Sequence, residues 1–166
     1  MVIIKCKKDS GGYNSMYLMK ALNYLYDREK ALHIGGYGVD TSDLKKTYKQ
    51  MCYVKKYFHK TQENPMIHFI ISFGDEVRTY EKAKAYAVLI GAFFKCGYQL
   101  IWAVHKKKRG DSLFHIHMIM NSVSFVDGKL YDSSRVNLTK LCDYVERVTG
   151  VNCKYYFAPQ NSTDDV

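Results

Sequence analysis

The sequence predicts an α+β fold, in which a central antiparallel, palm-like sheet of about five strands has helices packed on it. Apolar runs of strand length are interspersed with longer amphipathic stretches of helical period. Two neighbouring apolar runs are joined by a short basic turn, which predicts an antiparallel hairpin. The chain has 166 residues, 47% of them hydrophobic, which suits one domain with a core. We expect this domain to span residues 1–158, with a frayed tail at residues 159–166.

Each element follows from its local pattern. Apolar runs bounded by turn residues predict strands at residues 2–7, 66–73, 98–105, 115–123 and 151–157. Apolar residues repeated every three or four positions predict helices at residues 15–28, 41–59, 79–95 and 133–149. Asn14 or Ser15 is a candidate N-cap of the first helix, Thr41 or Ser42 caps the second, and Gly150 ends the last.

Glycine-rich and polar segments are expected to connect these elements. Residues 33–38 contain three glycines and predict a loop. Residues 106–111 form a basic turn within the hairpin, and residues 126–129 predict a tight turn.

The chain is strongly basic, with 25 Lys and Arg, 16 Asp and Glu, and a formal net charge of +9. This balance favours a polyanionic partner, nucleic acid first, and the 15 Tyr and 8 Phe include rings able to stack on unpaired bases. The five cysteines are far apart and odd in number, which disfavours a disulfide scaffold or a cysteine zinc site and favours a reducing cytosol. Lysines interrupt the first apolar run, so no signal peptide is expected, and no stretch is long enough to span a membrane.

The most informative feature is His115-Ile116-His117, inside an apolar run that predicts a buried strand. Side chains two residues apart on a strand share a face and lie roughly 6.5–7 Å apart, a good start for a metal site. His105 ends the preceding strand. If it shares that face, the hairpin assembles three imidazoles and leaves coordination positions open for substrate. The alternative is that these are half-exposed strand histidines without a metal.

The first predicted helix carries a candidate nucleophile. Its core stripe is formed by Leu18, Leu22 and Leu25. Tyr24 lies on nearly the opposite side, beside Lys20 and Arg28. Nearby cations and a metal-bound phosphate both favour ionisation of a phenol whose ordinary pKa is about 10. Tyr26, on the flank of the stripe, is the alternative nucleophile, and a surface tyrosine packed along basic side chains is the non-catalytic interpretation.

Three further residues are candidates for supporting roles. His68 is expected to orient a metal ligand or to be structural, rather than to bind the metal itself. Asn121 shares the strand face of His115 and His117, and is also a candidate for orienting a ligand. Glu76, just beyond the strand at residues 66–73, is a candidate base or outer partner of the site, and equally a solvated loop carboxylate.

Several basic residues are expected to bind DNA phosphates without reading the base sequence. They are Lys20, Arg28, Lys106, Lys107, Lys108 and Arg109. The lysines of the helix at residues 41–59 are expected to form a solvated face.

In this order, the segments resemble the N-terminal catalytic domain of plasmid mobilisation relaxases, the histidine-hydrophobe-histidine endonucleases. The resemblance covers most of the chain. Residues 21–30 resemble the nucleophile segment, and residues 68–76 resemble the middle motif, a strand ending in Ser-Phe before an acidic residue. His105 with residues 115–123 resembles the third and most specific motif. The basic run after His105 departs from the family, in which an acidic residue comes sooner.

The resemblance implies a metal-dependent relaxase that nicks and rejoins one DNA strand at an origin of transfer. Tyr24, or Tyr26 in its place, would form a 5′-phosphotyrosyl intermediate. The metal on His105, His115 and His117 would be Mg²⁺ or Mn²⁺, although three imidazoles suit Zn²⁺ or Ni²⁺. Single-stranded DNA and accessory relaxosome proteins would be the partners, in the bacterial cytoplasm. The alternatives are a rolling-circle replication initiator with the same chemistry and a non-catalytic DNA-binding module with structural histidines.

Overall fold

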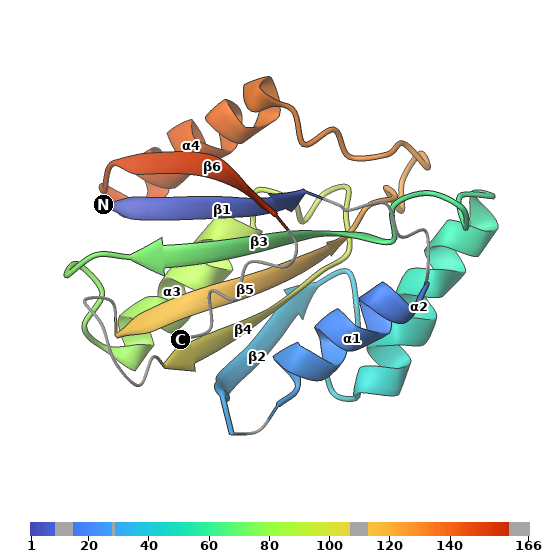
Figure 1. Ribbon diagram of the computed structural model, residues 1–166, viewed down its shortest axis with the longest axis horizontal. Coiled ribbons are helices and arrows are strands. Elements are labelled where there is room, and N and C mark those ends of the chain that lie inside the picture. The colour runs from blue at the N-terminus through green and yellow to red at the C-terminus, as the bar shows by residue number, and fades with distance from the viewer. Residues whose placement is uncertain (9–14, 28, 107–112, 160–166) are drawn as a thin grey trace.

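Six strands form one sheet in the computed structural model, which describes residues 1–8, 15–27, 29–106 and 113–159 (Figure 1). The strands are β1 (Val2–Lys8), β2 (Ala31–Tyr37), β3 (Met66–Phe73), β4 (Leu100–Lys106), β5 (Phe114–Asn121) and β6 (Cys153–Pro159). The helices are α1 (Ser15–Leu25), α2 (Leu44–Tyr57), α3 (Tyr80–Gly91) and α4 (Arg135–Thr149). The strand order is β2-β4-β5-β3-β1-β6, antiparallel throughout except for the parallel pair of β1 and β6. The predicted α+β class is confirmed, with one strand more than expected.

The additional strand is β2, where the glycines of residues 33–38 predicted a loop. The prediction was wrong because these glycines allow close approach between strands. A Cβ on Gly35 would lie 2.7 Å from the Cζ2 atom of Trp102, and a Cβ on Gly36 would lie 2.6 Å from the carbonyl oxygen of Leu100. Both neighbours belong to β4, with which β2 pairs. Any side chain at these two positions would collide with β4, so the glycines allow β2 to pair there as the edge strand beside the hairpin.

The helix ends partly differ from the predictions. Asp43, rather than Thr41 or Ser42, caps α2, because its side chain accepts a hydrogen bond from the backbone N–H of Lys46. α1 and α3 are shorter than expected, whereas α4 ends as predicted at Gly150, whose φ of 69° lies in the left-handed region. The predicted domain boundary falls one residue before the end of β6, and the predicted tail from residue 160 on lies outside the described residues.

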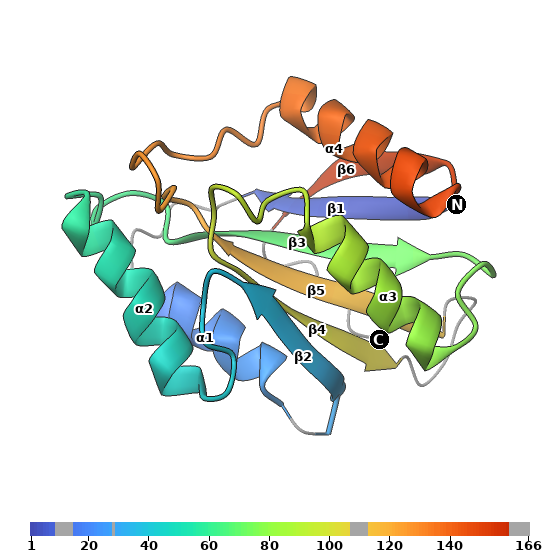
Figure 2. The same ribbon diagram turned by 180° about the vertical axis from the view of Figure 1, so that it is seen from behind.

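The helices divide between the two faces of the sheet, and each face has its own core. α3 and α4 pack on one face, seen in Figure 2, against the larger apolar cluster. α1 and α2 pack on the other face, in front of the sheet in Figure 1, where the predicted stripe of Leu18, Leu22 and Leu25 meets Ile101 and Ile119. In the part of the chain that the structure describes, no helix lies over the front of β3, β1 and β6.

A buried hydrogen-bond network joins α2 to the sheet. Lys55 is 6% exposed, and its Nζ donates to Oδ1 of Asn121 at 2.6 Å. The Asn121 amide donates in turn to the carbonyl of Met51 and to Oε1 of Gln99. Burial lowers the pKa of Lys55 from 10.5 to about 8. At pH values where Lys55 is protonated in the folded state, its burial therefore lowers the free energy of unfolding.

The stability cost of Lys55 should appear as a pH dependence that the Lys55→Met variant lacks. Between pH 8 and 10.5 the unfolded chain keeps the Lys55 proton and the folded chain releases it, so the wild type gains stability as pH rises. Over that pH window, the free energy of unfolding of the wild type should rise by about 3 kcal/mol relative to that of the variant. Urea unfolding of both proteins at several pH values measures it, and a constant difference would contradict the buried-lysine interpretation.

Candidate active site

Three histidines meet on the front face of the sheet, at one end of the hairpin of β4 and β5. The register pairs His105 directly with His115, and His117 with Ala103. Side chains two residues apart share a face, so the three imidazoles point to the same side. Their ring centroids are 4.8 Å apart for His105 and His117, 4.9 Å for His115 and His117, and 5.4 Å for His105 and His115. The common face that the sequence left open is confirmed, and we call this cluster the histidine triad.

The triad is buried, with exposed fractions of 1% for His105, 6% for His115 and 2% for His117. Burial is the main reason that the pKa of His117 lies well below its usual range, and the neighbouring imidazoles and the charge of Lys7 lower it further. The neutral imidazole is the form that binds a metal ion. At neutral pH, His117 is therefore held in the ligating state.

The donor set of the triad fits a divalent metal ion. The candidate ligand nitrogens of the three histidines all lie within 4.8 Å of one another. Two nitrogens on opposite sides of one ion, with bonds of about 2.1 Å, lie at most about 4.2 Å apart. The triad is thus close to the spacing that a single ion requires, and three imidazoles leave coordination positions for a substrate oxygen.

His68, predicted to orient a metal ligand or to be structural, contacts the triad from β3. Its Nε2 lies 3.0 Å from Nδ1 of His117. When Nε2 of His117 binds a metal, its Nδ1–H is the donor and His68 is the acceptor. With a metal bound, such a contact would fix the tautomer and the ring plane of His117, which is the usual role of a residue behind a metal-binding histidine.

Replacing His68 with alanine should therefore lower the metal affinity of the triad by roughly 10- to 100-fold. His68 is only partly buried, so the fold should persist. The His68→Gln variant keeps a side-chain acceptor and should recover part of the affinity. Competition with a chelating dye measures both variants, and equal affinity in the wild type and the alanine variant would show that His68 does not orient His117.

Tyr24 packs directly on the triad. Its ring centroid lies 4.9 Å from that of His117, at an interplanar angle of 68°, and 5.2 Å from that of His105. Nζ of Lys30 lies over the same ring, 4.7 Å from its centroid. We expected an exposed tyrosine, but Tyr24 is partly buried. The contacts of its ring with His105 and His117 account for this burial, although Tyr24 lies away from the core stripe of α1.

Tyr26, the alternative nucleophile, is engaged elsewhere. Its hydroxyl donates to the carbonyl oxygen of Thr41 at 2.9 Å and lies 2.8 Å from Oγ1 of Thr47. Burial raises its pKa above the ordinary value, which disfavours the phenolate. The contacts of Tyr26 tie α1 to the start of α2, whereas those of Tyr24 lie at the histidine triad.

A basic strip beside the triad was missed by sequence reasoning. On the half of the front face without a helix, Lys5, Lys7, Lys154 and Tyr156 share the face of the triad through the registers of β1 and β6. Nζ of Lys5 lies 5.4 Å from the centre of the Tyr156 ring, which is 42% exposed. The alternation of lysines in the first strand was the signal that could have indicated this strip.

Two predicted supporting residues have partners outside the triad. Asn121 lies four residues beyond His117, roughly 13 Å along β5, and its amide serves the Lys55 network. Glu76 forms an ion pair with the amino group of Met1, and this hydrogen bond lowers the pKa of its carboxyl group. A carboxylate with a lowered pKa is a weaker base, so these contacts do not support the assignments of Asn121 and Glu76 to the site, which stay predictions.

The predicted phosphate-binding residues are only partly described. Lys20 is exposed on α1, the helix that carries Tyr24, and Lys106 is exposed next to His105 at the end of β4. Arg28, Lys107, Lys108 and Arg109 lie outside the described residues.

Comparison with known families agrees with this geometry. Residues 17–151 match the family described as "Relaxase: MobA/VirD2-like, nuclease domain", and the chain belongs to that family. The matched span contains Tyr24, the histidine triad and His68. A comparison with curated proteins gave no match. Of the helices in the described ranges, none has both the length and the apolar character needed to cross a membrane.

Proposed function

We propose that this protein nicks and rejoins one DNA strand at an origin of transfer, using a divalent metal ion and a 5′-phosphotyrosyl intermediate on Tyr24. The observation that carries the proposal is the contact of the Tyr24 ring with both His105 and His117. A nucleophile for phosphoryl transfer must lie next to the group that stabilises charge on the phosphate. The match to a relaxase nuclease domain supports this assignment.

The proposed step is a transesterification at the scissile phosphate. The Tyr24 oxygen forms a bond to phosphorus, the bond from phosphorus to the 3′ oxygen breaks, and the proton lost by the phenol is balanced by the proton gained by the 3′ oxygen. A divalent ion on the triad supplies charge stabilisation for the phosphoryl oxygens. One phosphodiester replaces another, so the reverse attack by the 3′ hydroxyl rejoins the strand.

Residues around Tyr24 have separate roles in this proposal. Lys30, whose Nζ lies over the Tyr24 ring, places positive charge beside the nucleophile and the phosphate that it attacks. Lys5, Lys7 and Lys154 hold backbone phosphates along the open half of the sheet, and Lys20 holds them from α1. We further propose Mg²⁺ or Mn²⁺ as the ion, with Zn²⁺ and Ni²⁺ as the ions that three imidazoles bind more tightly.

The test is a covalent-adduct assay. The protein is incubated with end-labelled single-stranded DNA from the transfer origin of its own genetic element, with each of the four metals, and run on a denaturing gel. We expect a labelled protein band that requires metal and disappears on chelation. Tight DNA binding without an adduct under any metal would instead favour a non-catalytic DNA-binding module with structural histidines.

A further inference from the structure

The outward face of α2 combines aromatic rings with positive charge. Six exposed residues of this helix fall within about 120° of one another at 100° per residue. They are Lys45, Lys46, Lys49, Tyr53, Lys56 and Tyr57, which we call the tyrosine–lysine stripe. The helix sequence contains no acidic residue. A solvated face would account for the lysines but does not account for two large exposed rings among them.

The two rings are held ready for stacking. Tyr53 is 67% exposed and Tyr57 is 65% exposed, and their centroids lie 6.3 Å apart at an interplanar angle of 29°. Phe58 meets the Tyr57 ring edge to face, with the ring centroids 4.9 Å apart. Near-parallel, exposed rings on a rigid helix offer flat surfaces to planar ligands at a low entropic cost.

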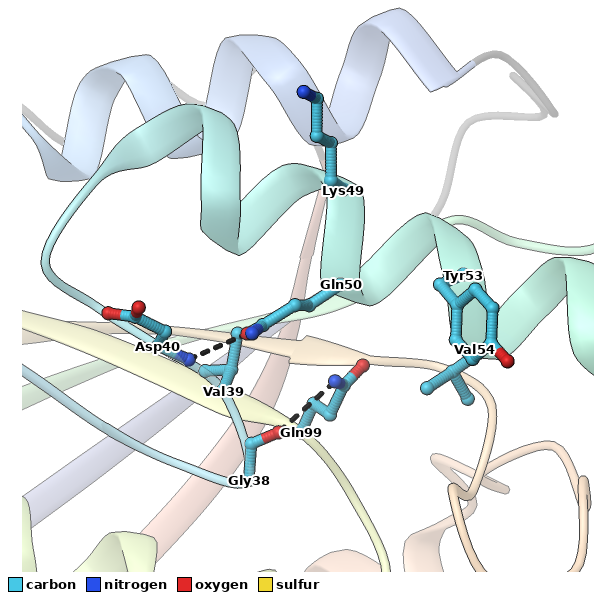
Figure 3. A pocket seen from close by; sticks show the side chains of 8 residues that line it. All are labelled: Gly38, Val39, Asp40, Lys49, Gln50, Tyr53, Val54 and Gln99. Carbon is cyan, nitrogen blue, oxygen red and sulfur yellow. Dashed lines mark hydrogen bonds between the residues drawn. The ribbon is translucent and has the colours of Figure 1, made fainter.

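A hollow of about 590 Å³ opens next to Tyr53 (Figure 3). Val39 and Val54 contribute apolar walls, and Gln50 and Gln99 contribute amides. Both amides are fixed in place, because Gln50 accepts from the backbone N–H of Asp40 at 2.7 Å and Gln99 donates to the carbonyl of Gly38 at 3.1 Å. Lys49 also lines the hollow, and its ammonium group extends away from the other lining side chains in Figure 3.

The charge around the stripe suits a polyanion. The acidic side chain that lines the hollow, Asp40, lies 3.6 Å from the ammonium group of Lys46. Asp43, at the start of the helix, is used as its N-cap. Lys45, Lys49 and Lys56 remain on the exposed face to meet phosphates.

We propose that the tyrosine–lysine stripe binds unpaired nucleotides of a DNA strand, with bases stacked on Tyr53 and Tyr57 and phosphates on the lysines. This is a second contact, away from the nucleophile. Gln99 precedes His105 by six residues, which places the hollow on the order of 20 Å from the triad, or about six nucleotides at a stacked spacing of 3.4 Å. That the bound strand is the strand being nicked rests on the proposed function. The stacking of bases on Tyr53 and Tyr57 does not depend on it.

The first test measures binding of labelled oligothymidylate to the full chain by fluorescence anisotropy, without metal, so that nicking plays no part. The Tyr53→Ala/Tyr57→Ala variant should bind at least ~10-fold more weakly than the wild type, and Tyr53→Phe/Tyr57→Phe should bind normally because it keeps both rings. Both positions are exposed, so the thermal unfolding midpoint should be unchanged. Wild-type affinity in the alanine variant, or an equal loss on duplex DNA, would overturn the proposal.

The second test separates local phosphate contacts from net charge. The variant with Lys45, Lys49 and Lys56 changed to Gln should lower the slope of log affinity against log salt concentration by about 2. The matched variant, with the exposed Lys84, Lys95 and Lys140 changed to Gln, should keep the wild-type slope. Equal slopes for the two variants would overturn the proposal. The two claims can fail separately. If the wild type forms no adduct but the stripe variants bind DNA more weakly than it does, the stripe proposal is supported and the proposed function is rejected.

Discussion

The Tyr24→Phe variant should form no covalent adduct with DNA under any metal, while its DNA affinity and its unfolding midpoint stay close to those of the wild type. The phenol oxygen is the atom that bonds to phosphorus, and no other group of the ring can replace it. The ring itself, which contacts His105 and His117, is retained in phenylalanine. A denaturing gel for the adduct and an anisotropy titration for binding measure the two properties on the same samples.

The matched control is Tyr26→Phe, two residues along the same helix. This variant loses the hydrogen bonds to Thr41 and Thr47, so its free energy of unfolding should fall by roughly 1 kcal/mol. Its unfolding midpoint should therefore lie below that of the wild type. Its adduct yield at a temperature where it is folded should match that of the wild type. A persistent adduct in Tyr24→Phe that disappears in Tyr26→Phe would reassign the nucleophile.

The His117→Asn variant should lose metal binding and nicking together. His117 contacts both other members of the triad, Tyr24 and His68, so its loss removes a ligand and the packing around the nucleophile. We expect the metal affinity to fall by more than 100-fold and the nicking rate to fall by at least roughly 10²-fold. Isothermal titration with metal and a single-turnover nicking assay measure the two effects.

His59→Asn is the matched control for that variant. His59 is exposed and has a φ of 55°, a backbone conformation that asparagine also tolerates, so this substitution should leave stability, metal binding and nicking unchanged. Nicking at the wild-type rate by His117→Asn would show that the triad is structural.

The contents of the triad could be predicted from the sequence because the evidence is local. A period of two residues places His115 and His117 on one face, and the short connection of the hairpin makes β4 and β5 neighbours. The register that sets His105 opposite His115 depends on packing along the whole pair of strands, and no local pattern specifies it.

The remaining differences come from tertiary contacts that the sequence does not display. The glycines of β2 are typical of a loop in the sequence, and only the structure shows that the ring of Trp102 occupies the space beside Gly35. Both Tyr24 and Tyr26 lie outside the core stripe of their helix, and only the placement of α1 on the sheet separates them. Asn121 lies on the same face of β5 as His115 and His117, but its side chain is hydrogen-bonded to Lys55 of α2.

The most direct test of the central claim is the site of DNA attachment. Trypsin should release residues 21–28 as one peptide, which contains both Tyr24 and Tyr26. After nicking and nuclease trimming, tandem mass spectrometry of that peptide locates the residual nucleotide. We predict a 5′-phosphate linkage on Tyr24 and unmodified Tyr26. A nucleotide on Tyr26, or an adduct whose linkage lies outside this peptide, would contradict the proposed mechanism.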